Sequence, residues 1–179
     1  DSVEVEAEQG KPTDIGGFAP QAIVLYRFPA RGSMPPVTLK WFHGGLLPPR
    51  PKQLEEKRKI ITEGAYYYGS KLVMTTNSHC QSLRIIPESD QRKNPPPPKT
   101  LRRVVGGHGG DFLRACRGGE PASSNFDYAA RLTEIVLLGN LAAQVGEKFA
   151  YDFKTGTTPN PKAAALLKRP PRKGWEQGY

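Results

Sequence analysis

The sequence of 179 residues contains no long apolar run, and hydrophobic residues make up only 37% of it. A transmembrane helix needs about 20 consecutive apolar residues, so we expect none and predict no association with a membrane. The first residues are acidic and lack the basic and then apolar order of a signal peptide. The sequence therefore gives no indication of the cellular compartment of the protein.

Cysteine and histidine are scarce, with two and three residues respectively. Cys80 and Cys116 fit no metal-binding spacing, and two free thiols, at least half-buried, are favoured over one disulfide. The sequence also has no Walker loop, no HExxH or GxSxG motif and no paired CxxC. We therefore expect no metal site, and no motif assigns a catalytic residue.

The chain carries 26 basic and 17 acidic residues, which gives a net charge of +9. A basic protein is attracted to the phosphates of nucleic acid whatever the base sequence, so nucleic-acid binding has to be considered. The basic residues are nevertheless scattered, with short concentrations only at residues 57–59, 102–103 and 168–173. No nucleic-acid-binding motif accompanies them, which argues against this function.

Proline and glycine are abundant, at 18 and 19 residues, and the regular segments between them are short. Residues 2–8 alternate between apolar and acidic side chains, which predicts a half-solvated strand. Buried or half-buried strands are predicted at residues 22–28 and 37–42. Further strands are expected at residues 60–62 with 65–68, 71–75 and 82–86. The turns between these later strands are of hairpin length, which favours antiparallel neighbours in one meander.

The longest periodic segment lies within residues 106–146, where a short helix, a polar turn and a long helix are expected. Apolar side chains cover two faces of the long helix, so we expect it to be almost wholly buried. Ser124 and Asp127 resemble a capping box at its start, and Gly146 supplies a left-handed stop.

Together these patterns predict an α+β fold: an open, mainly antiparallel sheet with helices packed on one face, followed by an extended C-terminal tail. Residues 1–155 are expected to form one domain, which includes a proline-rich linker at residues 94–100. Residues 148–153 are predicted as an edge strand of this domain. The tail, residues 156–179, is expected to contain a short helix at residues 162–168.

A glycine-rich stretch, residues 106–110, precedes the expected short helix. It is not a dinucleotide fingerprint, because Phe112 stands where the third glycine of G-x-G-x-x-G would be needed. His108 can hydrogen-bond a ligand there, with Asp111 one turn on to orient it. The alternative is that His108 caps the helix and the glycines permit close packing. His43 and His79 are expected to be solvated loop residues.

A series of short motifs runs through nearly the whole chain. The most distinctive is LTEIVLLGNLA, residues 132–142. The others are residues 26–32, 35–37, 41–45, 48–49, 108 with 111–113, 125–129, 160–161 and 172–176. In their identity and order these motifs resemble the C-terminal half of Gfo/Idh/MocA-type oxidoreductases, in the bacterial branch of that family.

The resemblance implies an open antiparallel sheet with helices on one face. In that family the other face often mediates oligomers, while the near side closes over a nicotinamide cofactor and a sugar or polyol held by a separate Rossmann domain. The family's Gly-rich nucleotide loop, its Glu-Lys-Pro lysine and its Asp/His helix motif are absent here and would lie before Asp1. Hydride transfer needs a dinucleotide and a general base near the substrate, so this chain is not expected to bind NAD(P) or to catalyse alone.

We therefore expect the chain to be the substrate-side or assembly half of an NAD(P)-dependent oxidoreductase acting on a sugar, polyol or glycoside. A Rossmann-domain partner, or an N-terminal half of the same protein, would complete it in a bacterial cytoplasm or periplasm. His108, Trp41, Arg172 and Asp111 are the candidate substrate contacts, and a structural role is the alternative for each.

A second class of function stays open. The chain can instead be a non-catalytic sheet module that forms a homo-oligomer or binds another protein. In this interpretation the strand at residues 2–8 offers an edge that another chain extends. The nucleic-acid function is the least favoured of the three.

Overall fold

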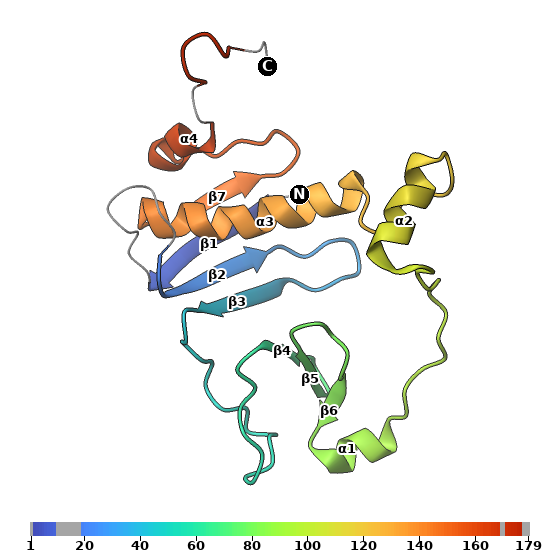
Figure 1. Ribbon diagram of the computed structural model, residues 1–179. Helices are drawn as coiled ribbons and strands as arrows, with labels where there is room; N and C mark the ends of the chain where they lie inside the picture. The colour runs from blue at the N-terminus through green and yellow to red at the C-terminus, as the bar shows by residue number, and fades with distance from the viewer. Residues whose placement is uncertain (1, 10–18, 169–170, 177–179) are drawn as a thin grey trace. The chain divides into compact units, whose positions relative to one another are not determined.

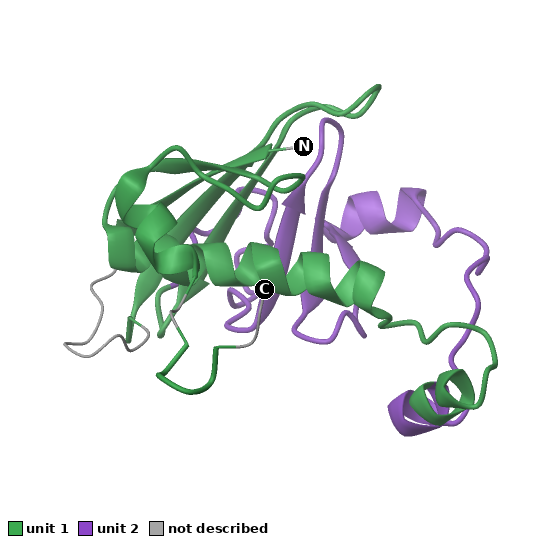
Figure 2. Cartoon of the chain, turned by 90° about the horizontal axis from the view of Figure 1, so that it is seen from above, with its two compact units in different colours: residues 1–46, 112–179 green, residues 47–111 purple. Residues whose placement is uncertain are grey.

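The structure is a computed structural model that describes residues 2–9, 19–168 and 171–176 (Figure 1). The chain forms two compact units (Figure 2). Unit 1 comprises Asp1–Leu46 and Phe112–Tyr179, and unit 2 comprises Leu47–Asp111. The fold is α+β, as predicted, and the strand pairs in both units are antiparallel. The predicted single meander is wrong, because the described strands form two sheets.

Unit 1 is built on a four-stranded sheet with the strand order β3-β2-β1-β7. Its strands are β1 (Ser2–Gln9), β2 (Ala22–Phe28), β3 (Val37–His43) and β7 (Phe149–Asp152). All four were expected from the sequence, including the position of β7 at an edge. The prediction that β1 offers an open edge is wrong, because β1 pairs with β2 on one side and with β7 on the other.

Helix α3 (Phe126–Val145) lies across one face of this sheet (Figure 1). It begins at Asn125 rather than at the predicted Ser124, because the Asn125 side chain accepts the hydrogen bond from the backbone N–H of Tyr128. It ends at Gly146, whose φ of +69° is the left-handed conformation that was predicted.

The expectation that α3 is almost wholly buried is wrong. Residues of its C-terminal half are buried against the sheet, and Ala142 has no exposed surface. In its N-terminal half, Tyr128 is 62% exposed and Leu132 is 50% exposed. The buried residues of α3 all lie between Leu138 and Ala143, so the first half of the helix is only partly covered by the described structure.

Helix α4 (Pro161–Leu167) has Asn160 as its N-cap and proline in its first turn. Its residue Ala163 is fully buried and belongs to the same core as Val5 and Ala142. The helix was expected in an extended tail beyond residue 155, and the structure places it in the packed part of unit 1. Helix α4 is therefore part of the unit 1 core rather than of a tail.

Unit 2 contains a three-stranded sheet in the order β4-β5-β6. Its elements are β4 (Gly64–Tyr68), β5 (Val73–Asn77), β6 (Arg84–Ile86) and helix α1 (Glu88–Lys93). The buried core is small and consists of Leu54, Val73 and Ile86. Residues 95–100, in the predicted proline-rich linker, form neither helix nor strand, and helix α2 (Gly107–Cys116) follows.

Cys80 and Cys116 are free thiols, as predicted, but both are exposed, so the expected burial is wrong. Cys80 lies in the turn after β5 and Cys116 at the last position of α2, and both positions face solvent. Within the described ranges, the structure contains no helix of sufficient length and apolarity to span a membrane.

Candidate functional site

The four candidate contact residues are divided between the two units. His108 and Asp111 lie in the first turns of α2, within unit 2. Trp41 lies in β3 and Arg172 in the described stretch of residues 171–176, both within unit 1. The structure therefore does not assemble the four side chains into one site within a unit, and each has to be considered in its own surroundings.

His108 is an exposed side chain at a glycine-rich helix entrance. Gly106 and Gly107 have φ values of +78° and +67°, a conformation that favours glycine. The backbone N–H of Gly110 donates to the carbonyl of Gly106 at 3.3 Å. The imidazole of His108 is thus presented to solvent on a short helix, where it can reach a ligand.

Asp111 is buried, with 5% of its surface exposed. Its Oδ1 lies 3.8 Å from Nη2 of Arg102 in an ion pair. Because Arg102 precedes α2 in the chain, this pair fastens the segment after the proline-rich stretch to the helix. That contact is a structural role for Asp111, and its predicted role in orienting His108 stays a prediction.

Arg172 lies in a local turn with Trp175. The guanidinium carbon lies 4.1 Å from the centroid of the Trp175 ring, a cation–π contact. The backbone N–H of Trp175 also donates to the carbonyl of Arg172 at 3.0 Å. The contacts described for Arg172 are therefore local to residues 172–175.

Trp41 belongs to an apolar row on edge strand β3. Val37, Leu39 and Trp41 are 56%, 41% and 52% exposed. In the sheet register Leu39 lies opposite Tyr26 and Trp41 opposite Val24. Directly opposed residues point to the same face of a sheet, and Tyr26 and Val24 belong to the core under α3, so the β3 row lies on the helix side.

A second apolar row lies along α3. Tyr128, Leu132 and Val136 follow one another at intervals of four residues, and the row continues to Gly139. Gly139 packs against Tyr26 and Val24 of β2, so this flank of the helix faces β2 and β3. The other flank faces β7, where Tyr151 donates a hydrogen bond to Glu134 at 2.5 Å.

The two rows face the same region above the sheet. We call them together the uncovered apolar surface, which comprises Val37, Leu39, Trp41, Tyr128, Leu132 and Val136. In Figure 1, α3 passes in front of β1, and β2 and then β3 lie on one side of the helix. These residues are recognisable as apolar in the sequence. Because the whole helix was expected to be buried, the exposure of its N-terminal half was not predicted.

The opposite face of the sheet is charged. Arg27 pairs with Glu4 and Glu6 at 3.0 Å each, and Lys40 pairs with Glu8 at 2.5 Å. A hydrogen bond from Lys148, with further support from Arg27, lowers the pKa of the Glu4 carboxyl. This face has the ion-pair pattern of a solvated surface, whereas the helix side has exposed apolar side chains.

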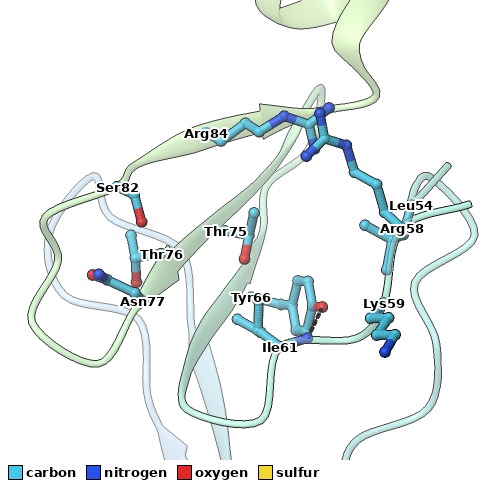
Figure 3. A pocket seen from close by; sticks show the side chains of 10 residues that line it. All are labelled: Leu54, Arg58, Lys59, Ile61, Tyr66, Thr75, Thr76, Asn77, Ser82 and Arg84. Atoms are coloured by element: carbon cyan, nitrogen blue, oxygen red, sulfur yellow. Dashed lines mark hydrogen bonds between the residues drawn. The ribbon is translucent and has the colours of Figure 1, made fainter.

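Unit 2 contains a cavity of about 340 Å³ that sequence analysis missed (Figure 3). It is lined by Leu54, Arg58, Lys59, Ile61, Tyr66, Thr75, Thr76, Asn77, Ser82 and Arg84. The antiparallel pairing of β4 with β5 places Tyr66 opposite Thr75 at this site. The basic residues 58–59 were noted in the sequence, but no sequence pattern indicated that they lie beside β5.

An ion-pair network borders the cavity. The carboxylate of Glu55 pairs with the guanidinium of Arg84 and accepts the backbone N–H of Glu88 at 2.8 Å. Arg84 also pairs with Glu88 at 3.3 Å. The hydrogen bond from Arg84 is the largest cause that lowers the pKa of Glu55 to about 2. The network connects the irregular segment at residue 55 with β6 and α1.

This lowered pKa predicts an acid-sensitive unit 2. A carboxyl with a depressed pKa in the folded protein stabilises it fully above its ordinary pKa of 4.5, and this contribution is lost as pH falls through about 2. We expect the urea resistance of unit 2 to fall over this range, as followed by NMR signals of β5. Glu55→Gln should make the urea resistance of unit 2 less dependent on pH. Glu56→Gln, which changes an exposed neighbour, should leave this dependence as it is in the wild type. An equal slope in wild type and Glu55→Gln would contradict the assignment.

No protein-family model and no curated protein matches the chain. Over the described ranges, no cluster of three or more His, Cys, Asp or Glu residues is arranged to hold a metal ion.

Proposed function

We propose that this chain is the substrate-side and assembly half of an NAD(P)-dependent oxidoreductase of the Gfo/Idh/MocA type, which acts on a sugar, polyol or glycoside. A Rossmann-domain partner, or a preceding part of the same protein, supplies the dinucleotide site and the proton-transfer groups. The single observation that carries the proposal is the uncovered apolar surface on the helix side of the unit 1 sheet.

The composition of this surface is typical of a protein–protein interface rather than of a surface in contact with water. It combines Trp41 and Tyr128 with aliphatic side chains, and each of its six residues is at least 41% exposed. Contiguous exposed apolar patches are uncommon on monomeric proteins and mark sites of association. Aromatic side chains are also enriched where interfaces are energetically important. A partner that packs beside α3 and over β3 would complete the helix layer of the sheet.

The glycine-rich stretch before α2 lacks the pattern of a dinucleotide-binding loop. The glycine-rich stretch leads into α2, but residues 95–104 before it form no strand, and Phe112 stands where a third glycine is needed. The chain's own contribution is therefore to bind and orient the substrate. In this proposal the exposed imidazole of His108 hydrogen-bonds a hydroxyl of the substrate.

The alternative is a non-catalytic module that forms a homo-oligomer. The same surface favours it, because its six named residues are uncharged and are compatible with a second copy of the same surface. The two functions differ in what covers the surface. A Rossmann-domain partner brings affinity for NAD(P), whereas a second copy of the chain does not.

Substitution of the uncovered apolar surface tests whether it binds the partner. We expect Trp41→Ser combined with Leu132→Ser to weaken association at least tenfold, because both side chains lose apolar contact area in the complex. The measurement is analytical ultracentrifugation of the chain with the proteins isolated alongside it. Both side chains are half exposed, so the fold should tolerate the change.

The matched control is Tyr68→Ser, which removes an aromatic side chain that is 61% exposed in β4 of unit 2. This variant should associate like the wild type. Unchanged association of the double variant would show that another surface carries the contact, and the proposal would lose its main support.

A further inference from the structure

The cavity of unit 2 combines features that point to a ligand. Ser82, Thr76 and Asn77 lie on one side of it, Lys59 and Leu54 lie on the other, and Thr75 and Tyr66 lie between them (Figure 3). All ten lining residues belong to unit 2, so the cavity is formed by this unit alone. It is separate from the uncovered apolar surface, which belongs to unit 1.

Thr75 supplies the observation that distinguishes this cavity from an ordinary surface hollow. The residue is only 8% exposed, and its Oγ1 is buried without a hydrogen-bond partner in the described structure. Buried hydroxyl groups nearly always have a partner, because an unsatisfied one loses its hydration without compensation. The Nε of Arg84, another lining residue, is likewise buried without a hydrogen-bond partner. Two unsatisfied polar atoms thus belong to side chains that line one cavity.

The charge at the cavity is positive. Arg58, Lys59 and Arg84 contribute three cations to the lining. Arg84 pairs with Glu55 and Glu88, and Arg58 pairs with Glu55 at 3.6 Å, so two carboxylates face three cations. Among the described residues Lys59 forms no ion pair, and it is an exposed residue of the lining.

The remaining lining is apolar. Leu54 is buried, and it lines the cavity together with Ile61 and the ring of Tyr66. The hydroxyl of Tyr66 accepts a hydrogen bond from the backbone N–H of Ile61 at 3.1 Å, which fixes the ring beside the cavity. A bound molecule therefore meets an apolar wall as well as donors and positive charge.

We propose that this cavity binds a small organic oxyanion, with a carboxylate or phosphate group on a compact apolar body. The oxygens of the anion accept hydrogen bonds from the Thr75 hydroxyl, and Lys59 supplies the compensating charge. The apolar body lies against Leu54, Ile61 and Tyr66. The hydroxyl of Ser82, on the side of the cavity away from Lys59, is a further donor.

The proposal can be tested on the full chain with three simple probes. Benzoate and phenyl phosphate carry the two oxyanions on the same ring, and benzyl alcohol is their neutral counterpart. Binding is measured by titration of the amide NMR signals of β5 and β6. We expect at least one anion to bind at the cavity at least tenfold more tightly than benzyl alcohol, and the stronger of the two identifies the preferred group.

Two variants and a control connect the binding to the cavity. Thr75→Val keeps the shape of the side chain and removes the unsatisfied hydroxyl, so we expect binding at least fivefold weaker and a melting temperature that is unchanged or higher. Lys59→Gln should also weaken binding of the anion at least fivefold. Lys52→Gln removes the same charge from an exposed position of unit 2 that does not line the cavity and should bind like the wild type.

Several results would overturn the proposal. They are the absence of binding by both anions, equal binding of benzyl alcohol, unchanged binding in Thr75→Val, or an equal loss in Lys52→Gln. None of these results bears on the partner-binding surface of unit 1, because no residue of that surface is substituted.

Discussion

Gly139→Ala is expected to destabilise unit 1 by about 3 kcal/mol, because α3 packs on β2 at this residue without room for a methyl group. A Cβ at residue 139 would lie 2.1 Å from the hydroxyl oxygen of Tyr26 and 3.2 Å from its Cζ. Tyr26 is only 4% exposed, and its burial raises the pKa of the phenol to about 12. The ring has little free space, so the helix has to move away from the sheet. Urea unfolding followed by NMR signals of β1 measures the loss.

Gly109→Ala is the matched control for this prediction. Gly109 lies in helix α2, and a Cβ there would have no heavy atom within 4 Å. Alanine favours a helix over glycine by about 1 kcal/mol, so this variant should be unchanged or more stable. Tyr26→Phe should partly rescue Gly139→Ala because it removes the nearest atom. A Gly139→Ala protein as stable as the wild type would contradict the described packing of α3 on β2.

Ile86→Ala is expected to have the largest effect on unit 2. Ile86 is 1% exposed and is the largest fully buried side chain among the described residues. It lies in a core whose other buried members are Leu54 and Val73. Truncation of a buried isoleucine costs about 2–5 kcal/mol, and a core of this size has few other contacts to compensate. We expect loss of hydrogen-exchange protection in β5.

The control is Leu83→Ala, which truncates a neighbouring aliphatic side chain that is 59% exposed. This variant should keep the protection of β5 amides near the wild-type level, because no buried contact is lost. Equal loss of protection in both variants would show that Ile86 is not the centre of the unit 2 core.

The sequence predicted the elements of unit 1 well because each has a strong local signal. The alternation from Val3 to Glu8 and the apolar run of β2 specify strands, and Gly146 specifies the end of α3. The number of sheets was predicted wrongly, as one rather than two. Hairpin-length turns indicate antiparallel neighbours, but they do not show that β3 and β4 belong to different sheets.

The candidate site was less predictable. His108 was correctly placed at a helix entrance, because the surrounding glycines are a local signal. Exposure of Trp41 depends on which elements cover β3, and that is a tertiary property. The cavity around Thr75 was missed for the same reason, since a threonine in a strand gives no sign that its hydroxyl lacks a partner.

The most direct test of the proposed function is to isolate the protein under native conditions from its own source, identify what accompanies it by mass spectrometry, and titrate the isolate with NAD+ and NADP+. The proposal predicts a Rossmann-domain polypeptide, either as a partner or joined to this chain, and dinucleotide binding by the isolate. A self-associated chain without a Rossmann domain and without affinity for either dinucleotide would contradict it and would favour the non-catalytic module.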